Sequence, residues 1–291
     1  MNPALPKDNK LNITKKGGVN FADLHLHTIF SDGTHTPRQL ISESTKAGLS
    51  AIAIVDHDTV EGVGPAMDLA KSENIELLPG VELTAEYEGS EIHILGYLLD
   101  YKAGALLEKL ETLKKNRIER IYKITDKLKG MGLNLSPEDV FEISKQGTVG
   151  RLHVARAMVK GGLTGSVPEA FKKYIGDKSP AYVLGFRFTP DKAIKLIRDT
   201  GGIPVLAHPY TLNNDGIILK FIDYGLMGLE VYYPEHSQAM VNSYLGLAKT
   251  HNLLITGGSD CHGSAKPGIR IGAVKISYGL VEKLKEAKDK L

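Results

Sequence analysis

The sequence of 291 residues predicts an α/β protein built on a TIM-like barrel, complete or incomplete, with a helical insertion. The first observation is that short β-rich runs alternate with helical segments, a pattern typical of parallel α/β architectures. The second is the number of β-rich runs, because seven clear strands and a weaker eighth suggest a barrel of this type. The third is a long helical stretch that interrupts the alternation after Asp100.

The expected strands are short runs rich in apolar and β-branched residues. In chain order they cover 21–28, 51–57, 76–84, 91–98, 203–208, 228–233, 253–259 and, more weakly, 271–276. Helices are expected to begin near Pro37, Val60, Pro190, Asp215, Ser237 and Tyr278. Thr36 and Thr189 each place a hydroxyl directly before a proline, which predicts capped helix starts there. In such a barrel the active site lies where the strands end.

The insertion begins with residues 104–130, which we interpret as one long helix because apolar side chains recur at near-helical spacing. Shorter helices are expected at 136–146, 151–161 and 167–175. We therefore divide the chain into a leader, a discontinuous barrel and a helical insertion over the barrel mouth, at 1–20, at 21–100 with 186–291, and at 101–185. The leader should be poorly ordered, and it lacks the apolar segment of a secretory signal.

The composition is ordinary for a globular protein, with 42% hydrophobic and 24% charged residues. No window approaches 18 uninterrupted apolar residues, so we expect no membrane span. The single cysteine, Cys261, excludes an intrachain disulfide and is consistent with a cytoplasmic location. Residues 104–180 carry fifteen Lys/Arg against nine Asp/Glu. This basic insertion suits an anionic substrate, or it is simply a solvated helix face.

Polar residues gather at the ends of the predicted strands. His25 and His27 are two residues apart in the first strand, so their side chains should point to the same face. The other positions in this pattern are Asp32, His57, Glu82, His93, His208, Asp260 and His262. Any one of the histidines could be structural, but imidazoles and carboxylates grouped in this way are good ligands for divalent metals. We therefore predict a metal centre at the barrel mouth.

Spacing along a strand also predicts which of several neighbouring side chains point into the site. Asp260 and His262 are two apart and can point inward together, which turns Cys261 away into packing. In a regular strand His57 faces opposite to Asp56 and Asp58. We take His57 as the ligand and Asp58 as an orienting partner or a proton acceptor. Glu82 follows a Gly-Val pair and is the natural bridging carboxylate.

The same residues stand in short motifs in a fixed order. Between Phe21 and His262 the chain has HLHT and SDG, then AIVDHDT, GVE, HILGY, AHP and SDCH. In this it resembles the PHP (polymerase and histidinol phosphatase) family of metal-dependent phosphoesterases. The resemblance implies a distorted (β/α)7 barrel that binds up to three metal ions.

The resemblance also implies which residues hold each ion. His25, His27, Glu82 and Asp260 would form one set, Glu82, His93 and His208 a second, and Asp32, His57 and His262 a third. Some family members have histidine in place of Asp32, so the third site is more oxygen-rich here. Two to three divalent ions are expected, and ligands of these types favour Mn²⁺, Fe²⁺ or Zn²⁺ without choosing among them.

The insertion should select the substrate. Arg151 lies in the first turn of a predicted helix, where backbone N–H groups and an arginine suit a phosphate. Arg156 in the same helix and Lys178 in a later turn are further candidate contacts, although a capping role for Arg151 and a purely surface role for Lys178 stay open. Both segments resemble a PHP subgroup comprising a nucleoside 3′,5′-bisphosphate phosphatase and a 5′→3′ exoribonuclease. His236 could touch substrate or protonate the leaving group.

The leading hypothesis is a phosphoesterase that acts on nucleotides or short RNA through a metal-activated hydroxide. It would be a 3′,5′-bisphosphate phosphatase, a 5′→3′ oligoribonuclease, or both. The alternatives are a small-metabolite phosphatase of the histidinol-phosphate type and a non-catalytic module that binds metal or nucleotide. The modest basic surplus and few aromatics of the insertion predict no stable nucleic-acid complex.

Overall fold

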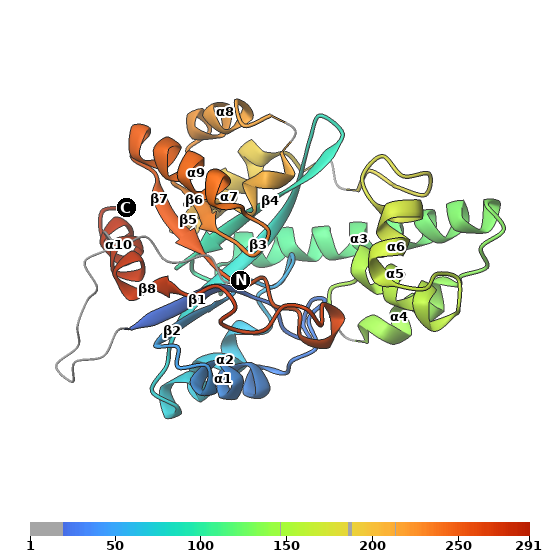
Figure 1. The fold of residues 1–291 in the computed structure, drawn as a ribbon, viewed down its shortest axis with the longest axis horizontal. Helices are drawn as coiled ribbons and strands as arrows, with labels where there is room; N and C mark the ends of the chain where they lie inside the picture. The colour runs from blue at the N-terminus through green and yellow to red at the C-terminus, as the bar shows by residue number, and fades with distance from the viewer. Residues whose placement is uncertain (1–19, 146, 186–187, 213) are drawn as a thin grey trace.

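The computed structural model describes residues 20–145, 147–185, 188–212 and 214–291. The predicted leader, apart from its last residue, and the predicted barrel boundary at 186 lie outside the described residues. Within them, eight strands form one sheet in the order β7-β6-β5-β4-β3-β2-β1-β8. The sheet curves until Leu26 of β1 forms a parallel bridge with Cys261, just after β7. The result is a nearly closed barrel surrounded by helices (Figure 1), which confirms the predicted fold class.

The strands differ from the prediction mainly at the ends of the sheet. Their bounds are β1 (Phe21–Leu26), β2 (Ala51–Ile54), β3 (Glu76–Tyr87), β4 (Ser90–Tyr97), β5 (Ile203–Leu206), β6 (Gly228–Tyr232), β7 (Leu254–Gly257) and β8 (Ile276–Ser277). Neighbouring strands run parallel, except that β4 is antiparallel to β3 and β5, and β8 to β1. The weak run predicted at 271–276 is wrong in extent, because only its last residue lies in a strand.

β3 and β4 form a hairpin in place of the parallel pair that strict alternation predicts. Glu88 and Gly89 connect them with φ of +49° and +79°. Two consecutive positive φ values occur in two-residue turns that match the twist of hairpin strands. A parallel connection needs a dozen or more residues, far more than the chain provides here. As a consequence Glu82 lies in the middle of a long β3, and Thr84 is paired with His93 of β4.

Helices cover the outside of the barrel. They are α1 (Pro37–Lys46), α2 (Val63–Ser72), α7 (Pro190–Asp199), α8 (Ile217–Asp223), α9 (Gln238–Thr250) and α10 (Tyr278–Lys288), with short turns η2 (Pro209–Thr211) and η3 (Gly263–Ala265). Thr36 caps α1 by accepting a bond from the Gln39 backbone N–H. Thr189 makes no such bond, so the cap predicted there is wrong, although Pro190 still begins α7. Among the described residues, no helix has the length and apolar character to cross a membrane.

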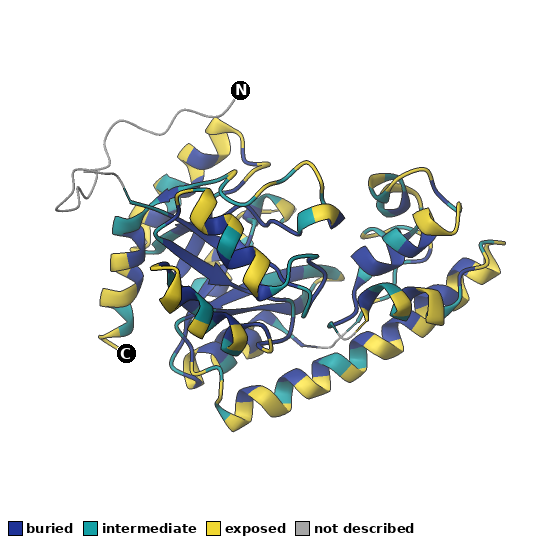
Figure 2. Cartoon of the chain, turned by 90° about the horizontal axis from the view of Figure 1, so that it is seen from below, coloured by how far each residue is buried: buried dark blue, intermediate teal, exposed yellow. Residues whose placement is uncertain are grey.

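The insertion contains α3 (Gly104–Gly130), α4 (Pro137–Ser144), α5 (Arg151–Lys160), α6 (Val167–Ala170) and η1 (Phe171–Ile175). Its helices share an apolar core that includes Ile124, Met158 and Ile175. The first half of α3 belongs to a different cluster, because Leu106 and Leu113 pack against barrel residues. Figure 2 shows α3 running from the barrel to the far end of the insertion. One continuous helix therefore connects the two cores.

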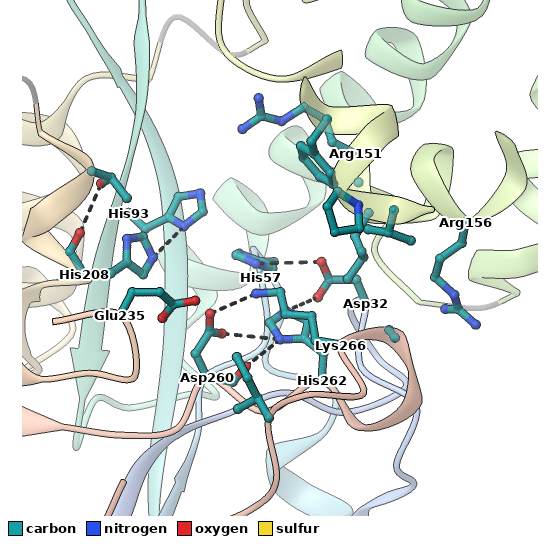
Figure 3. Close-up of a pocket in the computed structure, with 18 of the residues that line it drawn as sticks. Asp32, His57, His93, Arg151, Arg156, His208, Glu235, Asp260, His262 and Lys266 are labelled. Atoms are coloured by element: carbon teal, nitrogen blue, oxygen red, sulfur yellow. Dashed lines mark hydrogen bonds and ion pairs between the residues drawn. The ribbon is translucent and has the colours of Figure 1, made fainter. Parts of the chain in front are cut away.

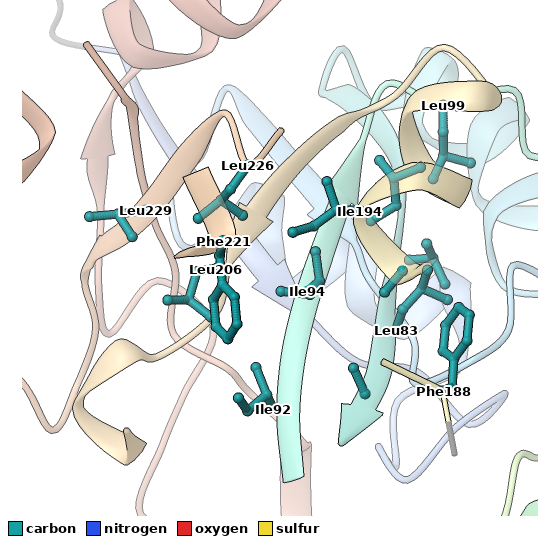
Figure 4. Packing of buried hydrophobic residues seen from close by; sticks show 14 of the residues in the cluster. Leu83, Ile92, Ile94, Leu99, Phe188, Ile194, Leu206, Phe221, Leu226 and Leu229 are labelled. Carbon is teal, nitrogen blue, oxygen red and sulfur yellow. The ribbon is translucent and has the colours of Figure 1, made fainter. Parts of the chain in front are cut away.

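Three apolar clusters hold the barrel together. The largest packs β3 to β6 against α7, α8 and α9, with Leu83, Ile94, Leu206 and Phe221 among its members (Figure 4). A second joins β1 to β5 with α10, and a third joins β1, β2 and β3 with α1 and α2. Alternate residues of β2 enter the second and third clusters, as expected for a strand buried on both faces. These clusters fix the strands whose ends carry the polar site.

Candidate metal centre and active-site cavity

β1 carries two histidines at the centre of the site. His25 and His27 are fully buried, and the same two carboxylates approach both. Asp260, which follows β7, places Oδ1 3.5 Å from His25 Nε2 and 3.0 Å from His27 Nε2. Glu82 Oε2 lies 3.1 Å and 3.2 Å from the same two nitrogens. Four side chains from three distant segments therefore converge on one point.

Glu82 lies between two groups of histidines. Its Oε1 is 2.8 Å from His93 Nδ1 and 3.1 Å from His208 Nε2. Its Oε2 is 3.4 Å from His57 Nδ1, in addition to the contacts with β1. Because the two oxygens face different histidines, this geometry suits a carboxylate that bridges two ions.

Asp32 lies in a third group of potential ligands. Its Oδ1 is 3.1 Å from His262 Nε2, and its Oδ2 is 3.9 Å from His57 Nε2. The His27 ring stacks against both imidazoles, with centroid distances of 4.1 Å and 4.7 Å. Among the residues that the structure describes, three groups each have their potential ligand atoms within 4.8 Å of one another: His27 with Asp32, His57 and His262; His25 with His27 and Asp260; and His57 with Glu82 and His93.

The local backbone conformation allows these side chains to converge. Asp260 and His208 have φ of +53° and +28°, values that residues other than glycine rarely adopt and that cluster at functional sites. A Cβ at Gly258 would lie 2.4 Å from the His25 Cβ. Glycine therefore allows the chain after β7 to pass directly beside β1. This approach brings Asp260 to the two β1 histidines.

The donor set fits divalent ions better than it fits hydrogen bonding alone. Several buried atoms make no contact of hydrogen-bond geometry with any described residue, although some lie close to another candidate ligand. These atoms are both ring nitrogens of His27, Nδ1 of His57 and of His208, and Oδ1 of Asp32. Imidazole nitrogen and carboxylate oxygen are ligands that suit Mn²⁺, Fe²⁺ and Zn²⁺. The Cys261 sulfur packs in the cluster of α1 and α2, outside the three ligand groups.

The electrostatics of the site favour positive charge. Burial lowers the pKa of His27, but Asp260 and Glu82 outweigh it and raise that pKa to about 9. Burial also lowers the pKa of His93, which Glu82 and Glu91 raise to about 10. Burial would raise the pKa of Glu82, yet the surrounding histidines hold it well below its usual range. Metal ions can supply the positive charge that this arrangement favours, in place of protons.

Residues 23–147 match the PHP domain family. The chain is also 33% identical over 245 residues to a 5′-3′ exoribonuclease of Haemophilus influenzae, across 82% of this chain and 89% of that one. The chain belongs to the PHP family. This PHP protein is 28% identical over 256 residues to a 3′,5′-nucleoside bisphosphate phosphatase of Chromobacterium violaceum, covering 86% of this chain and 90% of the relative. The structure of a protein assigned as a metal-dependent phosphoesterase, from Bifidobacterium adolescentis, is 31% identical with a TM-score of 0.83, over 90% of this chain and 94% of that one.

The family assignment confirms the predicted enzyme class, a metal-dependent phosphoester hydrolase. Such an enzyme needs space for a substrate beside the candidate ligands. A cavity of about 1170 Å³ lies between the barrel and the insertion, beside these candidate ligands. Its barrel wall is formed by ligand candidates from Asp32 to His262, and its other wall comes from α5, α6 and η1 (Figure 3).

Other polar side chains contact the candidate ligands and hold them in place. His25 Nδ1 donates to Glu230 Oε1 at 2.8 Å, and the His208 backbone N–H donates to Glu230 Oε2 at 2.8 Å. Tyr233 donates to Asp260 Oδ2 at 2.7 Å, and Lys266 Nζ is 2.9 Å from the same oxygen. Such partners orient metal ligands and set their tautomers.

These supporting residues were not predicted from the sequence. Glu230 had a recognisable signal, since it is a charged residue inside the apolar run of β6. Glu91, whose Oε1 lies 3.1 Å from His93 Nε2, also had a signal, because it is two residues before His93 and therefore on the same face of β4. Lys266 and Tyr233 carried no comparable signal, because only the folded chain brings them to Asp260.

The substrate contacts predicted in the insertion fall in different environments. Arg151 already pairs with Glu91 at 3.2 Å and with Asp177 at 2.5 Å. Arg156 lines the cavity and has no hydrogen bond or ion pair to any described residue. Lys178 is exposed and is not among the residues that line the cavity, whereas Lys172 is. Arg156 is therefore better placed to receive an anion than its position in the helix indicated.

The two predicted catalytic residues also lie apart from the cavity lining. Asp58 Oδ2 is held by Arg117 Nε at 2.7 Å, and its Oδ1 accepts from the Thr84 backbone N–H at 2.8 Å. With both oxygens engaged, Asp58 has the geometry of an orienting partner. His236 donates from Nδ1 to the Val231 carbonyl at 2.8 Å and packs among tyrosine rings. The neighbouring Glu235, in contrast, lines the cavity.

Proposed function

We propose that this PHP phosphoesterase hydrolyses phosphate esters of nucleotides or short RNA, as a 3′,5′-bisphosphate phosphatase, a 5′→3′ oligoribonuclease, or both. The observation that carries the proposal is the two-sided cavity. One wall presents the candidate metal ligands, and the other presents Arg156 and Lys172. Two separate cationic regions suit a substrate with two phosphates, one at the metals and one at the insertion. The names of the two relatives, an exoribonuclease and a bisphosphate phosphatase, support the same class.

The size of the cavity supports a substrate larger than a simple sugar phosphate. Its volume of about 1170 Å³ exceeds the range of roughly 300–1,000 Å³ typical of small-molecule sites. Phe171 and Tyr210 also line it, which provides aromatic surface for a base. These features favour a nucleotide or a short oligonucleotide over histidinol phosphate.

We infer that two to three divalent ions of Mn, Fe or Zn are held by the nine predicted ligands, in the three sets given by the family motifs. When bound, these ions would neutralise phosphate oxygens and lower the pKa of a bound water towards about 7. Glu230 and Glu91 would orient the His25 and His93 rings through their other nitrogens. Asp58 would contribute indirectly, by fixing the strand end that presents His57.

Two further groups of the cavity have charges that suit the reaction. Burial lowers the pKa of Lys266, but Asp260 raises it to about 12, so the ammonium stays charged beside the phosphate. Partial desolvation and the nearby Asp260 carboxylate raise the pKa of Glu235. Glu235 is therefore a better candidate than His236 to protonate the leaving oxygen, since it lines the cavity.

The test is a substrate panel with the Mn²⁺-loaded enzyme. It compares adenosine 3′,5′-bisphosphate, short RNAs with 5′-phosphate or 5′-hydroxyl ends, and histidinol phosphate, with His25→Ala as the inactive control. We expect the highest kcat/KM for the bisphosphate or the 5′-phosphorylated RNA. A preference for histidinol phosphate would favour the metabolite phosphatase, and no hydrolysis of any ester would favour a binding module. We propose that the enzyme acts in the cytoplasm, without a stable nucleic-acid complex.

A further inference from the structure

Glu91 is the residue at which the metal centre and the insertion meet. Its side chain is 9% exposed, and its position in β4, two residues before His93, places it on the same face of the strand as His93. Its Oε1 is 3.1 Å from His93 Nε2 and 3.2 Å from Arg151 Nη2. Its Oε2 is 2.8 Å from Arg120 Nη1. One carboxylate thus contacts a candidate metal ligand and two arginines of the insertion.

The contact with His93 has the geometry of a ligand and its orienting carboxylate. His93 Nδ1 faces the candidate metal position, 2.8 Å from Glu82 Oε1 and 3.3 Å from His208 Nε2. Its other nitrogen is therefore the one that donates to Glu91. A carboxylate in this position fixes the tautomer and ring orientation of a metal-ligating histidine.

The contacts with the arginines give the same carboxylate a second role. The side chains of Arg120 and Arg151 are 4% and 14% exposed, so both guanidiniums need a counter-charge within the protein. Arg120 comes from α3 and Arg151 from α5, the helix that carries Arg156 along the cavity. The position of the substrate-facing wall is therefore linked to Glu91.

We propose that Glu91 is a positioning residue that couples His93 to Arg120 and Arg151. Metal binding at His93 and anion binding at the insertion then depend on each other through one carboxylate, and the coupling is reciprocal. This inference rests on the proposed ligand role of His93. It does not depend on which phosphoester is the substrate.

The test begins with metal affinity, which requires no substrate. Chelator-treated Glu91→Ala and Glu91→Gln variants are titrated with Mn²⁺ by calorimetry, with Glu88→Gln on the exposed turn of the same hairpin as the control. Loss of an orienting carboxylate typically weakens metal binding 10- to 100-fold. We expect this loss for one ion in Glu91→Ala and a loss near the lower limit in Glu91→Gln, which retains an acceptor oxygen for His93.

The Asp177→Asn variant distinguishes the proposed coupling through Glu91 from a purely structural role of Glu91. Asp177 is the other acidic partner of Arg151, and its exposed carboxylate does not contact His93. Asp177→Asn should raise KM while leaving Mn²⁺ affinity unchanged, whereas both Glu91 variants should change KM and Mn²⁺ affinity together. Mn²⁺ affinities of Glu91→Gln within twofold of those of Asp177→Asn would overturn the proposal, even if Glu91→Ala fails to fold. Loss of the proposed nucleotide activity would leave the metal result standing.

Discussion

Replacement of Arg156 by alanine tests whether the insertion wall binds a second phosphate. Arg156 lines the cavity and has no ion pair with any described residue, so its removal leaves no buried counter-charge behind. Hydrogen bonds to charged groups contribute about 1.5–3 kcal/mol. Because the cavity is open to solvent, we take the lower limit of about 1.5 kcal/mol, which corresponds to roughly a tenfold change in kcat/KM.

The effect should depend on the substrate. We expect kcat/KM for adenosine 3′,5′-bisphosphate to fall about tenfold, and that for the corresponding monophosphates to fall much less, since they lack the second phosphate. Lys178→Ala is the matched control, because it removes an exposed cation of the insertion that does not line the cavity. Initial rates with Mn²⁺ across a range of substrate concentrations give kcat/KM for the bisphosphate and for each monophosphate. An equal loss for bisphosphate and monophosphate would refute the assignment of Arg156 to a second phosphate site.

Three further changes test the centre and its support. Asp260→Ala removes a candidate ligand shared by both β1 histidines, and it should abolish hydrolysis while circular dichroism stays unchanged; retained activity would contradict the site. Chelation should lower the melting temperature, because Mn²⁺ at 100 times its Kd stabilises a protein by about 2.7 kcal/mol; identical melting curves with and without Mn²⁺ would argue against binding. Arg117→Met leaves Asp58 buried without its main counter-charge, so the free energy of unfolding should fall by about 3–5 kcal/mol. Urea denaturation measures this loss, and a change as small as that of the exposed Lys115→Met on the same helix would contradict it.

The barrel and the convergence of its ligands were predictable because both follow from short-range rules. His25 and His27 share a strand face by their spacing, and strand ends meet at one edge of a barrel. The hairpin of β3 and β4 was also within reach, since the short connection cannot cross over. The predicted strand ended at residue 84, so Glu82 was expected near a strand end, whereas β3 continues to Tyr87.

Whether a given side chain is free to bind the substrate was not predictable, because this depends on partners from distant parts of the chain. Arg151 has a favourable position in the first turn of α5, yet its guanidinium is already paired with Glu91 and Asp177. Arg156, five residues later, remains open to the cavity. Sequence spacing places a residue on a face of a helix, but it does not identify the counter-charges that other segments bring there.

The buried arginines of α3 explain how the insertion and the metal centre keep a fixed geometry. Arg117 and Arg120 are three apart and therefore neighbours on one face of the helix. Arg117 holds Asp58, next to His57, and Arg120 holds Glu91 close to His93. Each arginine thus contacts a carboxylate adjacent to a candidate ligand. Changes elsewhere in the insertion can reshape the cavity without moving the ligands, whereas a change at either arginine should disturb the cavity and the metal centre together.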